Sequence, residues 1–151
     1  PRSTLFPYTT LFRSESDSQN FLYTLHYVLH ELKWPLKYYK HVITPLSFEE
    51  MEKRPDKREL TAIRQTLGHL EINGPNTVIA MLPDGSIMTC CDSKKLRPVV
   101  VGGTKDLMAI SSEVCGLNVI LPDRDQSKDI YPNEREIVMI TPGMEVQRWK
   151  Q

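Results

Sequence analysis

The apolar residues of this chain change their spacing near residue 74, and that change limits the folds open to it. From Ser16 to Ile72 they recur at intervals of three and four, the period of an amphipathic helix. After Asn73-Gly74-Pro75 they form short runs separated by turn residues, a pattern typical of strands. Because helices come first and antiparallel strands follow, we predict an α+β fold.

Three helices are predicted in the first half. The first begins at Ser16 or Asp17, either of which can act as its N-cap, and ends before Pro35. A short second helix follows Ser47 as its N-cap. The third occupies residues 56–72, where helical spacing joins Leu60, Ile63, Leu67 and Leu70.

Strands are predicted at residues 77–82, 86–91, 97–102, 106–111, 135–140 and 144–149. The first two flank Pro83-Asp84-Gly85, whose Asp-Gly pair supplies the positive φ of a tight hairpin. The polar segment Asp123–Asp129 lacks the glycine and terminal glutamate of a calcium loop, so we expect a solvated loop there.

Charge and hydropathy exclude two classes of partner. The formal net charge is zero, and without Arg2 and Arg13 it is −2, which is no footprint for nucleic acid or an anionic membrane surface. No apolar run approaches the ~20 residues that span a bilayer. We therefore predict no nucleic-acid or membrane partner.

Cysteine and histidine spacing indicates neither disulfides nor metal. Cys90, Cys91 and Cys115 lie in apolar runs without a disulfide framework or zinc-ligand spacing, so we expect buried thiols in a reducing, cytoplasmic setting. His26 and His30 have the i, i+4 spacing of two zinc ligands, but no general-base glutamate lies between them. We expect partly buried helix histidines and no metal site.

The segment Thr4–Ser14 reads as TLFPYTTLFRS. It resembles, codon for codon, a common sequencing-library adapter translated in one frame. It has neither the apolar run of a secretory signal nor the Arg-rich helix of an import signal. We therefore expect residues 1–14 to be a non-native, adapter-derived segment that stands in place of the natural N-terminus.

Four short motifs occur in a fixed order. Glu15-Ser16-Asp17-Ser18-Gln19 opens a helix, Asn73-Gly74-Pro75 precedes a strand, Asp92-Ser93-Lys94-Lys95-Leu96-Arg97-Pro98 joins strands, and Ser111-Ser112-Glu113-Val114 follows one. The series resembles the signatures of class II glutamine amidotransferases, especially the stand-alone subunits of archaeal-type glutamate synthase and N-methylglutamate synthase. It implies that residues 15–151 are the C-terminal part of such a domain, with a partial αββα sandwich of the N-terminal-nucleophile hydrolase type.

The resemblance also implies a mechanism. In that family an N-terminal cysteine thiol attacks the side-chain amide of glutamine, its own α-amine acts as base, and an oxyanion hole stabilises the tetrahedral intermediate. These groups precede the Ser-Asp-Ser motif, so no catalytic residue is assigned within the chain, and the 151-residue chain is expected to be inactive. Asn73-Gly74 matches the family's structural turn and receives no catalytic role.

Asp17 is the substrate-binding residue that the resemblance implies, because the family's aspartate holds the α-ammonium of glutamine. Its local context leaves a simple N-cap role open as well. Asp92 and Arg97 are expected to pair or to brace their loop, with a plain surface salt bridge as the alternative. Supporting or structural roles are expected for Ser16, Asp92, Arg97, Ser112 and Glu113.

The implied function is hydrolysis of glutamine to glutamate and ammonia, with the ammonia passed to a synthase subunit or domain. No cofactor is expected on this chain. One alternative is the amidotransferase domain of another biosynthetic enzyme, such as amidophosphoribosyltransferase or an N-methylglutamate synthase. The other is a docking or regulatory subunit that has kept the fold and lost the nucleophile.

Overall fold

The computed structural model describes residues 16–72 and 74–150. The predicted adapter-derived segment, residues 1–14, lies outside the described residues. The described residues are 39% helical and 20% strand, which is consistent with the predicted α+β class. It divides into two compact units with a boundary between Tyr39 and Lys40. Within the described ranges, no helix has both the length and the apolar character needed to cross a membrane.

The first unit contains the predicted N-terminal helix. α1 (Asp17–His26) continues as a π-helical turn, Tyr27–Glu31, and a 3₁₀ turn follows at Leu36–Tyr38. The helix ends ahead of Pro35, as predicted. Leu25 and Val28 are buried, and the Tyr39 hydroxyl donates to the carbonyl oxygen of Phe21 at 3.1 Å. Leu22 is exposed, because it lies at the margin of the helix face that carries the buried Leu25 and Val28.

The second unit begins one residue into helix α2 (Tyr39–Ile43) and continues with helices α3 (Phe48–Glu52) and α4 (Lys57–Leu67). Ser47 caps α3 as predicted, and Glu50 completes a capping box. The periodic residues Leu60, Ile63 and Leu67 of α4 are buried, which confirms the third predicted helix.

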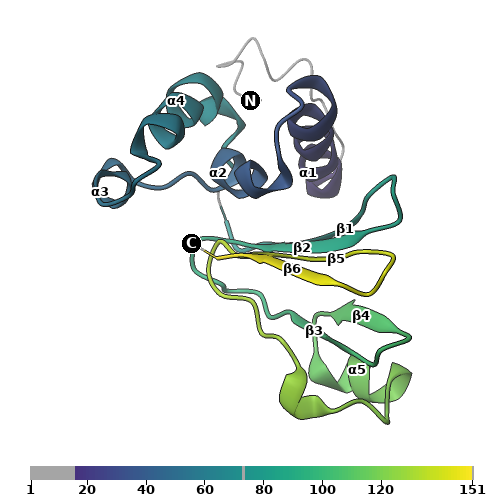
Figure 1. Ribbon diagram of the computed structural model, residues 1–151. Coiled ribbons are helices and arrows are strands. Elements are labelled where there is room, and N and C mark those ends of the chain that lie inside the picture. The colour runs from purple at the N-terminus through teal and green to yellow at the C-terminus, as the bar shows by residue number, and fades with distance from the viewer. Residues whose placement is uncertain (1–15, 73, 151) are drawn as a thin grey trace. The chain divides into compact units, whose positions relative to one another are not determined.

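All six predicted strands are present, and all pairings between them are antiparallel. β1 (Thr77–Met81), β2 (Ile87–Cys91), β5 (Ile137–Ile140) and β6 (Val146–Trp149) form one sheet in the order β1-β2-β5-β6 (Figure 1). The hairpin between β1 and β2 turns at Gly85, whose φ of +84° is strained for any residue with a Cβ. The predicted Asp-Gly turn is therefore confirmed.

β3 (Val100–Gly103) and β4 (Met108–Ser111) form a separate two-stranded sheet, followed by helix α5 (Val114–Ile120). Val101 of β3 packs in one apolar cluster with Val138 and Ile140 of β5, so side chains of both sheets share a core. The backbone of Val101 also exchanges hydrogen bonds with that of Ile130, at 2.9 and 2.7 Å.

Candidate functional site

Asp17 lies in the first turn of α1 and is exposed. The N-cap position belongs to Ser16, whose extended backbone precedes the helix and whose side chain makes no capping hydrogen bond. The structure thus places Asp17 one residue inside the helix, which rules out the simple N-cap alternative. Its carboxylate sits near the positive end of the helix dipole, where negative charge is favoured, and it faces solvent.

Asp92 organises the loop that follows β2. Its side chain is buried, and its carboxylate accepts hydrogen bonds from the backbone amides of Asn76 at 2.9 Å, Lys94 at 2.7 Å and Leu96 at 3.3 Å. Its backbone amide donates to the Asn76 carbonyl, and its own carbonyl accepts from the amide of Arg135 at 3.0 Å. The buried carboxylate thus ties its own loop to Asn76, which precedes β1, while the Asp92 backbone adds the segment before β5.

The Asn73-Gly74-Pro75 motif leads into this arrangement. Asn73 lies outside the described residues. Gly74 has a φ of +123°, a conformation that favours glycine, and it precedes the Asn76 amide that Asp92 binds. Gly74 and Pro75 thus form a bend ahead of β1, in keeping with the structural turn expected from the sequence.

Arg97 does not pair with Asp92: no ion pair between them occurs among the described residues. Arg97 is exposed, and its carbonyl oxygen accepts a hydrogen bond from the Thr77 hydroxyl at 3.1 Å. The ion pair expected from the sequence is absent because the backbone amides already satisfy the buried carboxylate. Asp92 does brace the loop, but it does so by accepting hydrogen bonds from backbone amides rather than by pairing with Arg97.

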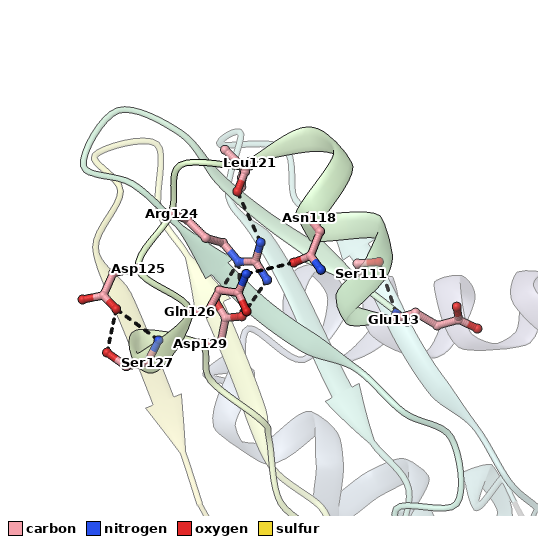
Figure 2. A network of polar contacts seen from close by, with 9 residues as sticks. All are labelled: Ser111, Glu113, Asn118, Leu121, Arg124, Asp125, Gln126, Ser127 and Asp129. Atoms are coloured by element: carbon pink, nitrogen blue, oxygen red, sulfur yellow. Dashed lines mark hydrogen bonds and ion pairs between the residues drawn. The ribbon is translucent and has the colours of Figure 1, made fainter.

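Ser112 and Glu113 mark the junction between β4 and α5, and both are exposed. The Glu113 amide donates to the Ser111 hydroxyl at 3.2 Å, as Figure 2 shows. The Cys115 thiol donates to a Glu113 carboxylate oxygen at 3.1 Å, and this hydrogen bond raises the pKa of the thiol. Among the described residues, no hydrogen bond or ion pair links Ser112 or Glu113 to Asp92.

A buried glutamate supports the neighbouring loop. Glu136 is fully buried and accepts from the Arg148 guanidinium at 2.7 Å and from the backbone amide of Asn133 at 2.7 Å. Burial alone would raise the pKa of Glu136, but the hydrogen bonds from Arg148 and Asn133 keep it below the ordinary value. The carboxylate is therefore charged and holds the loop before β5 in place.

A buried lysine, Lys40, holds the end of β6 and the residue that follows it. It is 2% exposed, and its ammonium donates to the carbonyl oxygens of Trp149 at 2.8 Å and Lys150 at 2.7 Å. Burial lowers the pKa of Lys40 to about 8. Sequence reasoning missed Lys40 and Glu136. A lone ammonium among apolar and aromatic residues, as in YYKHVI, is the signal that could have found Lys40, whereas Glu136 follows Glu134 and Arg135 and carries no such signal.

The segment Asp123–Asp129 corrects the expectation of a solvated loop. Arg124 and Asp129 form a buried bidentate pair, with Nε–Oδ1 at 2.9 Å and Nη2–Oδ2 at 2.8 Å (Figure 2). Arg124 also donates to the Leu121 carbonyl at 3.2 Å. A Cβ on Gly102 would collide with the Asp129 carboxylate, so β3 passes directly against the pair. The charges are structural, and the remaining residues of the segment are exposed.

Two further expectations about burial were wrong in part. Cys90 and Cys91 are buried as predicted, and burial raises the pKa of both thiols, that of Cys91 to about 11. Cys115 is instead exposed on α5.

His26 and His30 are also exposed rather than partly buried, because they lie off the face that carries Leu25 and Val28. Their rings stack at 4.8 Å. In the described ranges, no cluster of three metal-ligating side chains occurs.

Comparisons with known proteins give one informative relative. An uncharacterized protein of Archaeoglobus fulgidus is 26% identical over 113 residues, which cover 74% of this chain. The chain spans only about a third of that protein's length, since the match covers 30% of it. No protein-family profile and no solved structure matches the chain.

Proposed function

We propose that the chain is part of a class II glutamine amidotransferase domain, whose intact form hydrolyses glutamine to glutamate and ammonia for a synthase partner. The proposal rests on the positions of the four signature motifs in the fold. In order, they occupy the start of α1, the turn before β1, the loop after β2 and the junction of β4 with α5. Each is a connection or helix terminus, the places in a fold where binding and catalytic residues are concentrated.

Asp17 is the residue of this chain that would meet the substrate. Its exposed carboxylate makes no hydrogen bond or ion pair with the described residues and is free to accept one from an ammonium group. The α-ammonium of glutamine is such a group. The proposal gives the three cysteines no role as nucleophile, because the pKa of each thiol lies above its ordinary value.

The αββα sandwich is part of the same proposal. It is supported by two antiparallel sheets that share an apolar core through Val101, Val138 and Ile140. In the sandwich, the nucleophilic cysteine and the oxyanion donors would come from residues that precede Ser16 in the natural protein. The thiolate would displace ammonia from the glutamine amide, and water would then release glutamate from the thioester.

The test begins with the natural reading frame upstream of Glu15. We expect a cysteine that becomes N-terminal, either after the initiating methionine or after a short propeptide. Ammonia release from glutamine should be readily measured for the protein made from that frame and should stay at background for the 151-residue chain. A natural start without cysteine, or glutamine hydrolysis by the 151-residue chain itself, would contradict the proposal.

A further inference from the structure

A depression of about 540 Å³ lies at one end of the larger sheet. Lys94, Lys95, Asn133, Glu134 and Lys150 line it. They come from three places in the second unit: the loop after β2, the loop before β5 and the residue that follows β6. Its volume falls within the range of small-molecule sites.

Each of these three segments is held by a buried charged residue. The Asp92 carboxylate binds the amides of Lys94 and Leu96. Glu136 binds the amide of Asn133, and the Lys40 ammonium binds the carbonyl of Lys150. The backbone around the depression is therefore fixed before any ligand arrives, which lowers the entropy cost of binding.

The lining is strongly cationic in a chain whose net charge is zero. The lining residues named carry three ammonium groups and one carboxylate, that of Glu134. Lys94, Lys95 and Lys150 take part in no ion pair among the described residues, whereas Lys57 and Lys128 each hold a carboxylate within 4 Å.

The charges of the lining lysines also act on neighbouring groups. Burial acts to raise the pKa of both Cys91 and Glu136, and the ammonium groups of Lys95 and Lys150, respectively, act to lower it. The side-chain amide of Asn133 donates one hydrogen bond to the Glu136 carboxylate at 3.1 Å, and its second N–H can donate to a ligand.

We propose that this depression, the lysine pocket, binds a multivalent anion of the phosphate class, such as a phosphorylated small molecule. A phosphate group carries about two negative charges and three acceptor oxygens, which matches three ammonium donors better than a single carboxylate does. Glu134 repels the same ligand and sets an upper limit on affinity. The pocket does not depend on the proposed amidotransferase activity.

Pyrophosphate is the probe that tests the pocket. Isothermal titration of the full 151-residue chain at constant ionic strength should show one saturable site with a Kd below about 1 mM. The triple variant K94Q/K95Q/K150Q should lose roughly ten- to thirtyfold in affinity, because three charge contacts disappear. The control K37Q/K53Q/K105Q removes the same charge from other exposed lysines and should change Kd less than about twofold. Glu134→Gln should have the opposite effect and tighten binding by a few fold.

Citrate tests whether the pocket prefers phosphate to carboxylate groups, and it should bind several times more weakly than pyrophosphate. Three results would overturn the proposal: no saturable binding below about 10 mM pyrophosphate, equal loss in the two triple variants, or weaker binding in Glu134→Gln. Citrate binding as tight as pyrophosphate would overturn the phosphate preference. Circular dichroism of each variant verifies that the fold is kept, so an unfolded variant cannot imitate a lost site.

Discussion

Replacement of Asp92 by alanine should cost much more stability than loss of an exposed loop carboxylate, because the Asp92 side chain is buried and accepts several backbone hydrogen bonds. The change leaves the backbone amides of Asn76, Lys94 and Leu96 without their acceptor. A hydrogen bond to a charged acceptor contributes about 1.5–3 kcal/mol, and two of these three are short. The desolvation cost of the buried carboxylate, also relieved by the change, offsets part of this.

The net expectation is a loss of about 3 kcal/mol in the free energy of unfolding, and a fall in Tm of roughly 10 °C for a domain of this size. Asp92→Asn keeps one acceptor oxygen but turns an NH₂ group toward an amide donor, so about half of that loss should remain. Urea denaturation followed by far-ultraviolet circular dichroism measures both values.

Asp84→Ala is the matched control, because the exposed Asp84 carboxylate accepts a single amide hydrogen bond, from Ser86 at 2.9 Å. It should cost less than about 1 kcal/mol. Arg97→Ala should cost less than about 0.5 kcal/mol, since Arg97 is exposed and unpaired with Asp92. Equal losses for Asp92→Ala and Asp84→Ala, or a large loss for Arg97→Ala, would refute the assignment of Asp92 as the centre of the loop.

Three further perturbations test other parts of the structure. Burial lowers the pKa of His41 from 6.5 to about 4, so the unfolded state binds the proton more tightly. Stability present above pH 6.5 should fall by about 3 kcal/mol as the pH drops to 4, and His41→Gln should flatten this slope while the exposed His69→Gln leaves it intact. Gly102→Ala should cost about 1–3 kcal/mol by forcing a methyl group against the Asp129 carboxylate; an unchanged melt would contradict that packing. Deletion of residues 1–14 should leave Tm unchanged. A fall of several degrees would show that the segment contributes to stability and would contradict the prediction.

The elements that the sequence predicts well are those whose signals are local. α4 has an unbroken helical period, Ser47 has its capping partner Glu50 three residues on, and the β1–β2 hairpin has an Asp-Gly turn. α2 and α5 were missed for physical reasons. α2 is short, follows a proline-containing segment and buries Lys40 and His41, so no amphipathic period marks it. α5 has the sequence VCGLNVI, which is poor in helix formers, and only Leu117 within it is buried.

The parts of the site that sequence could not provide depend on residues that meet only in the folded chain. Asp92 binds the amide of Asn76, sixteen positions away, and the Lys40 ammonium reaches the carbonyl of Lys150. The buried pairing of Arg124 with Asp129 is nearer in sequence, but its burial depends on the passage of β3 beside it at Gly102. Spacing along the chain carries no information on such contacts.

The proposed activity is tested most directly by the kcat/KM for glutamine of the protein expressed from its natural reading frame, before and after Asp17→Asn. The substitution keeps the size of the side chain and removes the charge that would hold the α-ammonium, so kcat/KM should fall roughly ten- to hundredfold while Tm barely moves. Glu59→Gln removes an exposed carboxylate from the first turn of another helix, α4, and should leave kcat/KM unchanged. An unchanged kcat/KM in Asp17→Asn would contradict the substrate role of Asp17 and, with it, the contact to glutamine proposed for this chain.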